Sequence, residues 1–304
     1  PGGCVRQAGT SLPPNPREGS RRNIAAHYDL GNAFFSLFLS RDLMYSSALY
    51  AEPGDTLVVA SQRKLARICE QLQIKAGDRV GEIGTGWGGF AVYAALHHGC
   101  HVTTTTISRE QFALATERVV SAGLQDKVTV LLKDYRDLEG QYDKLVSIEM
   151  IEAIGAQYLD TYFATLTRLL KPEGLALLQA ITIEDERYEQ ARRSVDYIKR
   201  FVFPGSFIPS LHAIMAAKTR SSDLQLIGQH DFGQSYALTL RAWRLRFLSQ
   251  LPAVRTQGFD ERFIRLWEFY LAYCEGGFLE RSIGVSQLLL ARPGYRPPPI
   301  EGTH

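Results

Sequence analysis

Residues 80–90, VGEIGTGWGGF, connect a short apolar strand to a turn that is dense in glycine. Apolar residues continue from Phe90 to Leu96, so a helix should begin directly after the turn. Glycines in the turn allow positive φ and let the backbone approach a ligand closely. The helix then presents free N–H groups and a positive dipole end. The stretch predicts a doubly wound α/β fold that binds its ligand at the carboxyl ends of the strands.

Two classes of cofactor suit this turn. Its glycine spacing fits the dinucleotide fingerprint, in which the next strand ends in an acidic residue that binds the ribose. Here the next strand, at 101–106, runs into Thr-Ile-Ser-Arg-Glu-Gln, which disfavours a nicotinamide dehydrogenase. An acid followed by G-x-G, as in Glu82 with Gly84 and Gly86, is the usual opening of S-adenosylmethionine methyltransferases. The acid suits the amino-acid part of a cofactor that has no pyrophosphate.

Further motifs lie on separate elements: HYDLGNAFF at 27–35, YSSA at 45–48, FPGSFIPS at 203–210 and YLAYCEGGF at 270–278. In this order and spacing the chain closely resembles the cyclopropane fatty acid synthases and mycolic acid cyclopropane synthases. The resemblance implies that a carbon from S-adenosylmethionine is added across the cis double bond of an unsaturated phospholipid acyl chain, giving a cyclopropane fatty acid. The open alternatives are a methylene or methyl branch formed by the same carbocation route, N-methylation of a small molecule, and lipid or cofactor binding without turnover.

Length and composition narrow the class of protein. At 304 residues the chain can form one large α/β domain with insertions. A net charge of +2 does not indicate a nucleic-acid binder. The cysteines, at 4, 69, 100 and 274, lack metal-ligand spacing and fit a reducing cytosol. No apolar run reaches the roughly 20 residues that cross a bilayer. These features favour a cytoplasmic protein. The resemblance further implies an enzyme peripheral to the inner face of the membrane that meets its acyl chains at the membrane surface, with a homo-oligomer as an option.

Alternation of strands and helices implies a largely parallel Rossmann-like sheet of about seven strands. We expect a flexible segment at 1–20, a methyltransferase domain at 21–292 and a tail at 293–304. Residues 1–20 could be the remainder of a link to the N-terminal domain of bacterial synthases. Strands are predicted at 79–84, 101–106, 128–133, 143–149, 174–181, 223–231 and 285–292. Helices are predicted at 23–39, 56–72, 109–122 and 158–170, with a helical substrate cap at 184–222 and 236–282.

Polar residues at the ends of the second and third strands are candidate cofactor ligands. Ser108 could equally cap the following helix, and Asp134 could serve only in a turn. In the binding interpretation, Asp134 accepts from the adenine amine and Tyr135 flanks the ring. The full set, to which the resemblance adds Tyr45 and Ser46 at the methionine part, is Tyr45, Ser46, Glu82, Gly84, Gly86, Trp87, Gly88, Thr106, Ser108, Gln111, Asp134 and Tyr135.

Two carboxylates, Glu149 and Glu152, follow the fourth strand and should face the ligand crevice, although either could cap the next helix. The resemblance assigns bicarbonate binding to Glu152, Tyr236 and the backbone of Ile181, together with positions 47 and 179. An anion beside a glutamate requires a shared proton or strong donors. We therefore expect bicarbonate as a second cofactor.

Two of these positions depart from the better-known synthases. Ser47 replaces a cysteine that is thought to act through its backbone amide. Gln179 replaces a histidine, and glutamine cannot take or give a proton near neutral pH. Gln179 therefore predicts a changed proton path and a larger proportion of methylene or methyl-branched product.

Cys274 and Tyr28 complete the catalytic candidates, with Glu152, Tyr236 and Gln179. Cys274 matches a family cysteine, but methyl transfer to an alkene needs no covalent enzyme intermediate, so a pocket-lining role is favoured. Tyr28 is the first candidate for stabilising a carbocation, since a ring face is worth about 0.5–2 kcal/mol to a cation. Two basic runs could be solvated helix faces or a lipid headgroup site: Arg187, Arg192, Arg193, Lys199 and Arg200, and Arg241, Arg244 and Arg246.

Overall fold

The computed structural model describes residues 30–297, so Tyr28 and the segment at 1–20 lie outside the described residues. Its centre is a seven-stranded sheet in the order β3-β2-β1-β4-β5-β7-β6. Strands β1 to β5 pair in parallel, whereas β7 runs antiparallel to β5 and β6. The strands are β1 (Arg79–Ile83), β2 (His101–Thr106), β3 (Val128–Leu132), β4 (Tyr142–Ile148), β5 (Leu170–Ile183), β6 (Gln225–Asp231) and β7 (Ile283–Ala291). The predicted fold class is confirmed.

All seven predicted strands are present, and β2 has its predicted bounds. The largest difference is β5, which begins at Leu170, four residues before the prediction. Helix α7 (Leu159–Leu169) ends just before it, because Leu170 already has an extended backbone, and Pro172 disfavours helix at Lys171, the residue directly before it. Lys171 and Pro172 thus belong to the strand.

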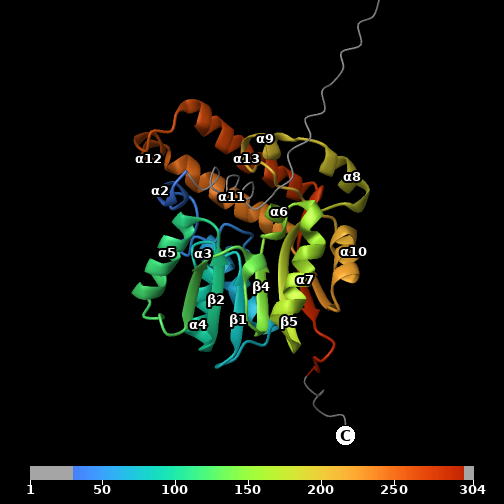
Figure 1. Cartoon of the computed structure of the whole chain (residues 1–304). Helices are drawn as coiled ribbons and strands as arrows, with labels where there is room; N and C mark the ends of the chain where they lie inside the picture. Colours follow the sequence, from blue (N-terminus) through green and yellow to red (C-terminus); the bar gives the residue numbers. More distant parts are fainter. Residues whose placement is uncertain (1–29, 298–304) are drawn as a thin grey trace, which may run out of the picture.

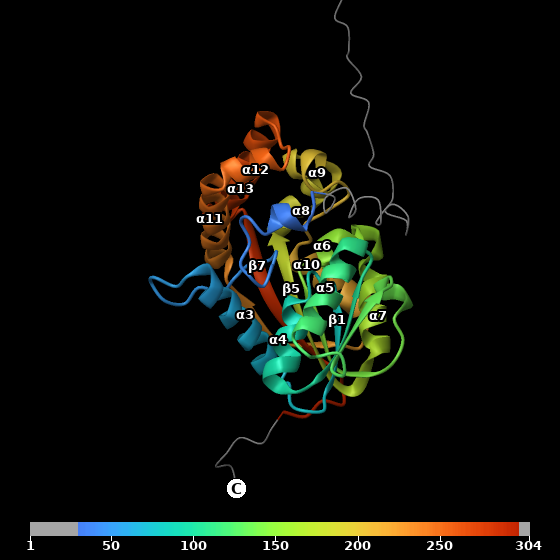
Figure 2. The same cartoon turned by 90° about the vertical axis from the view of Figure 1, so that its left-hand side faces the viewer.

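Helices cover both faces of the sheet (Figures 1 and 2). Helices α3, α4 and α5 share one hydrophobic cluster with β1 and β2, and α7 and α10 share another with β5 and β7. Apart from α7, the helices are α2 (Asn32–Phe35), α3 (Leu57–Gln71), α4 (Gly89–His98), α5 (Arg109–Ser121), α6 (Ile151–Ile154), α8 (Asp185–Arg193), α9 (Tyr197–Phe201), α10 (Leu211–Ser221), α11 (Gly233–Ser249), α12 (Leu251–Thr256) and α13 (Glu261–Leu279), with short 3-10 turns η1 (Tyr135–Asp137) and η2 (Ala156–Tyr158).

The helical cap lies over one end of the sheet, at the top of Figure 1, and consists of α8, α9 and α11–α13. Helix α10 instead packs against α7 beside the sheet, because its apolar residues Ile214 and Ala217 are buried there. An aromatic cluster joins the cap to the first described residues. Within it, the ring of Phe34 lies 5.0 Å from that of Trp267.

The expected helix at 23–39 is wrong for most of its described part, in which only Asn32–Phe35 is helical. Ser36 closes this short helix, and its hydroxyl donates to the carbonyl of Ala33. Serine side chains that bond the backbone in this way compete with continued helix.

The glycine turn after β1 forms as predicted. Gly84 and Gly86 have φ of 95° and 52°, which favours glycine. A Cβ at Gly84 would lie 2.7 Å from Met150 Cγ, so close packing also requires glycine there. At Gly86, by contrast, a Cβ would meet nothing within 4 Å. The turn therefore brings backbone to the edge of an open space.

Candidate active site

A cavity of about 890 Å³ lies between the carboxyl ends of the parallel strands and the cap. It combines the polar strand ends with apolar side chains from α11 and α13. Most predicted site residues line it: Tyr45, Ser46, Glu82, Gly84, Gly86, Trp87, Thr106, Gln111, Asp134, Tyr135, Glu152, Ile181, Tyr236 and Cys274. Gly88, Ser108, Ser47 and Gln179 do not line the cavity.

Glu82 is the buried acid beside the glycine turn, only 3% exposed. Burial raises its pKa to about 8. Its Oε2 has no hydrogen-bond partner among the described residues. Because an unsatisfied buried carboxyl oxygen is destabilising, this atom suits a ligand that donates hydrogen bonds. The turn and Glu82 together fit a ligand with amino and hydroxyl groups.

The strand-end residues bond mainly to one another. Ser108 accepts from the backbone N–H of Gln111 at 3.2 Å, so its capping role is confirmed. Thr106 donates to Gln111 Oε1 at 2.8 Å. The carboxylate of Asp134 accepts from Arg136 Nε and Nη2 at 2.8 and 2.7 Å and caps η1, as the turn interpretation requires. Contacts of these residues with a cofactor remain a prediction.

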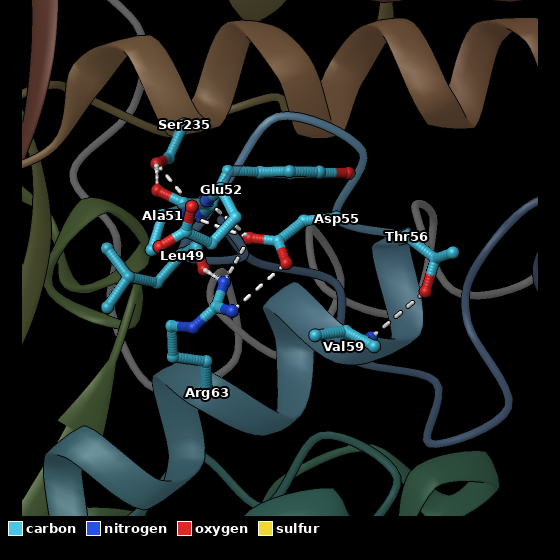
Figure 3. Close-up of polar contacts among 9 residues, drawn as sticks. Leu49, Ala51, Glu52, Asp55, Thr56, Val59, Arg63 and Ser235 are labelled. Atoms are coloured by element: carbon cyan, nitrogen blue, oxygen red, sulfur yellow. Dashed lines mark hydrogen bonds and ion pairs between the residues drawn. The ribbon is translucent and has the colours of Figure 1, made fainter.

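The segment that holds positions 45–47 is anchored on both sides. Figure 3 shows Arg63 of α3 donating to Asp55 and to the carbonyl of Leu49. Asp55 also accepts from the backbone N–H groups of Ala51 and Glu52, and Arg63 holds the pKa of this carboxyl well below its usual range. The hydroxyl of Ser235 on α11 accepts from the N–H of the neighbouring Tyr50 at 3.1 Å. These bonds position the segment between α3 and the cap.

Glu149 is the centre of the polar network at the end of β4. Its Oε1 accepts from the backbone N–H of Ser47 at 2.9 Å and from Gln179 Nε2 at 2.8 Å. Its Oε2 accepts from the hydroxyl of Tyr236 at 2.6 Å. Three groups predicted to hold bicarbonate therefore donate to a carboxylate of the protein itself.

The backbone places this carboxylate. Glu149 has φ of 51°, in the left-handed region, which costs about 1–3 kcal/mol for a residue other than glycine. Its N–H donates to the carbonyl of Gln179 at 2.7 Å, which holds that conformation. Met150 is the N-cap of α6, and no side chain caps that helix, so the capping alternative for Glu149 and Glu152 is wrong.

Glu152 has a different environment. Its Oε1 accepts from the backbone N–H of Ile181 at 2.5 Å, and its buried Oε2 has no partner among the described residues. Burial, followed by the charge of Glu149, raises the pKa of Glu152 to about 8. Burial also raises the pKa of Glu149, but Tyr236, Lys64, Gln179 and Ser47 oppose that rise. Glu149, which accepts three hydrogen bonds, is therefore the better stabilised carboxylate of the two, and Glu152 retains its proton near neutral pH.

Cys274 lines the cavity on α13. Burial raises the pKa of its thiol to about 12, so the thiol is neutral near pH 7. A cysteine nucleophile needs the opposite shift. On the same helix, the hydroxyl of Tyr270 lies 3.0 Å from that of Tyr45. Tyr270 is not among the predicted site residues, although it lies in the quoted YLAYCEGGF motif.

None of the helices within residues 30–297 combines the length and apolar character needed to cross a membrane.

Known proteins resemble the chain along most of its length. The family model of mycolic acid cyclopropane synthetase matches residues 16–288. The chain is 41% identical over 93% of its length to the tuberculostearic acid methyltransferase UfaA1 of Mycobacterium tuberculosis, and 42% identical over 88% to the cyclopropane-fatty-acyl-phospholipid synthase of Escherichia coli K12. It covers 68% and 66% of these two relatives, or about two thirds.

Solved structures show the same fold. The cyclopropane synthase MmaA2 of Mycobacterium tuberculosis superposes with a TM-score of 0.82 at 25% identity, over 89% of this chain and 98% of that one. The mycolic acid cyclopropane synthase CmaA1, solved with SAH and CTAB, gives 0.84 at 25% identity with the same coverage of both chains.

Proposed function

The chain is a methyltransferase of the mycolic acid cyclopropane synthetase family, and from that premise we propose that it methylates the cis double bond of an unsaturated phospholipid acyl chain. One observation carries the proposal. A single cavity joins the glycine turn to an apolar cap, with a hydrogen-bonded carboxylate at the junction. Incubation with S-adenosylmethionine and unsaturated phospholipid vesicles, followed by mass spectrometry of the acyl chains, tests it. An acyl chain heavier by one CH2 supports the proposal, whereas methylation of a small amine alone would contradict it.

The turn after β1 fits S-adenosylmethionine. Gly84 and Gly86 bring the backbone to the ligand, and Glu82 offers its unpartnered oxygen to the amino group. Asp134 and Tyr135 lie where the adenine is expected, beyond β3. When bound, this cofactor supplies an activated methyl group.

Protein groups must control the steps after methyl addition, because the acyl chain then bears a cationic carbon that has to lose a proton. If the C–H electron pair of the new methyl forms a bond to that carbon, a cyclopropane closes. If a hydride shifts first, loss of the same proton leaves a methylene branch, which a reductase could saturate. Buried surroundings exclude water, which would otherwise trap the cation.

We propose Glu149 as the acceptor of this proton. Its carboxylate lines the cavity and is held by Ser47, Gln179 and Tyr236. A fixed general base of this kind contributes about 10²–10⁴-fold to a rate. Bicarbonate bound near Glu152 is the alternative base. Turnover would require the ion if bicarbonate is the base, but not if Glu149 is.

The acyl chain has an apolar path through the cap. Ile198, Phe203, Leu240 and Phe278 line the cavity on that side. Exposed aromatic rings on α9 and α13, Phe201, Phe269 and Tyr273, lie beside it, and Tyr273 is also part of its wall. Exposed apolar rings can insert at a membrane surface, and tyrosine in particular favours the interface, which supports the proposed peripheral binding.

The basic runs give weaker support for headgroup binding. Arg192 and Arg193 pair with Glu189, and Arg241 and Arg244 pair with Glu275. These pairs favour the interpretation of both runs as helix faces.

Substitution of Gln179 by histidine should raise the proportion of cyclopropane product. Gln179 donates to Glu149, and its own Oε1 accepts from Gln287 Nε2 at 3.1 Å, so it anchors the base without exchanging protons. A histidine adds a group that titrates near neutral pH and can relay a proton. Gas chromatography of the acyl methyl esters measures the ratio of cyclopropane to methylene or methyl-branched chains.

The matched control is Gln179→Asn, which keeps an amide that does not titrate. We expect it to lower turnover without moving the product ratio towards cyclopropane. An identical product ratio in the wild type and Gln179→His would contradict the role assigned to this position.

A further inference from the structure

Lys64 is a lysine with no exposed surface, on the inner face of α3. It lies next to Leu65 and one turn before Ile68, both buried in the apolar cluster. Lysine is almost never fully buried unless it is paired, because removing an ammonium from water is unfavourable. Its position therefore needs a compensating partner.

That partner lies at the active site. Lys64 Nζ donates to the hydroxyl of Ser46 at 2.7 Å, and Ser47, the next residue, donates its N–H to Glu149. The negative charges of Glu149 and Asp42 oppose the lowering of the Lys64 pKa that burial causes. The carboxylate of Asp42 already accepts hydrogen bonds from the hydroxyls of Ser40 and Ser61. The Lys64 ammonium therefore lies outside the cavity and is hydrogen-bonded to Ser46, which lines it.

We propose that Lys64 is a positioning residue: the buried counter-cation that keeps the Glu149 carboxylate ionised, and the anchor of the Ser46–Ser47 segment that holds it. The proposal rests on the proposed base role of Glu149. Lys64 does not line the cavity, so it acts through Glu149 and Ser46 and not on the acyl chain.

The other groups around Glu149 do not supply this charge. Tyr236 from α11 and Tyr270 from α13 are neutral phenols whose pKa values are raised by burial. Gln179 from β5 is uncharged, and Glu152 from α6 is a second acid. Within the described part of the chain, Lys64 is the cation that acts on Glu149.

The charge of Lys64 is present at working pH. Burial lowers its pKa to about 8, while Glu149 and Asp42 raise it, so the ammonium form prevails near pH 7. A nearby opposite charge lowers the pKa of a carboxyl, by about 1–3 units for close pairs, and Lys64 acts on Glu149 in this direction. Without Lys64, Glu149 should therefore hold its proton to higher pH and be unable to accept another.

The test compares Lys64→Met, which removes the charge, with Ser46→Ala, which removes the hydrogen bond and keeps the charge. In Lys64→Met, the acidic limb of the pH dependence of kcat should move up by about 1–3 pH units, with turnover recovering at high pH. In Ser46→Ala, the limb should stay in place. A uniform loss of turnover in Lys64→Met, with no movement of the limb, would assign Lys64 to packing alone and overturn the proposal.

A second readout does not depend on turnover. Difference infrared spectroscopy of the cofactor-free wild type can follow the protonated-carboxyl band, with Glu149→Gln identifying the signal of Glu149. We expect Glu149 to be ionised at pH 7. Finding it protonated there would overturn the proposal even if Lys64→Met does not fold. If no acceptor is methylated, the proposed function fails, and this titration still decides the role of Lys64.

Discussion

Glu149→Gln should reduce turnover by about 10²–10⁴-fold, the usual contribution of a positioned general base. Glutamine has nearly the same shape but cannot accept the proton that the methylated acyl chain must lose. In the wild type, the carboxylate accepts hydrogen bonds from Ser47, Gln179 and Tyr236. The amide of a glutamine can satisfy only some of those donors. Turnover is measured as S-adenosylhomocysteine formed with unsaturated phospholipid vesicles.

The control for this substitution is Glu117→Gln, on the exposed side of α5. It makes the same chemical change far from the network and should have wild-type turnover. Calorimetry with S-adenosylmethionine should give similar affinities for both variants, because Glu149 is assigned to the proton and not to the cofactor. Wild-type turnover in a folded Glu149→Gln protein would exclude Glu149 as the base.

Gly86→Val should weaken S-adenosylmethionine binding by about 10- to 100-fold. A side chain at Gly86 meets no protein atom within 4 Å, so it would project into space that the cofactor is proposed to fill. The residue also has φ of 52°, where a β-branched side chain is strained. Isothermal titration calorimetry gives the affinity directly.

Gly123→Val separates the effect of filling the cofactor space from the effect of backbone strain. Gly123 has φ of 67° and open space around its Cβ, but it lies in the turn after α5 and does not line the cavity. This variant should lose stability, seen as a lower thermal midpoint, and keep its cofactor affinity. Equal cofactor affinity in Gly86→Val and the wild type would move the cofactor site away from the glycine turn.

The sheet and the glycine turn were predictable because their signals are local. Apolar runs of strand length gave all seven strands, and the glycines of 84–89 marked the turn that opens α4. The resemblance named Glu152 and the backbone of Ile181 as bicarbonate ligands. The structure joins these two groups by a hydrogen bond, and their binding of the ion stays a prediction. Such features depend on residues close in sequence or on a shared motif.

The centre of the site was not predictable from the same signals. Glu149 and Glu152 are three residues apart on SIEMIEAIG, and the left-handed backbone at Glu149 decides which carboxylate meets Ser47, Gln179 and Tyr236. Lys64 is a charged residue on an amphipathic helix, which normally predicts a solvated face. Its burial and its hydrogen bond to Ser46 appear only in the folded structure.

Turnover of the wild type in rigorously bicarbonate-depleted buffer, with and without added bicarbonate, tests the central claim most directly. If the Glu149 carboxylate is the base held by Ser47, Gln179 and Tyr236, depletion should leave kcat unchanged and added ion should not raise it. A large loss of turnover on depletion, restored by bicarbonate, would show that the ion and not Glu149 removes the proton.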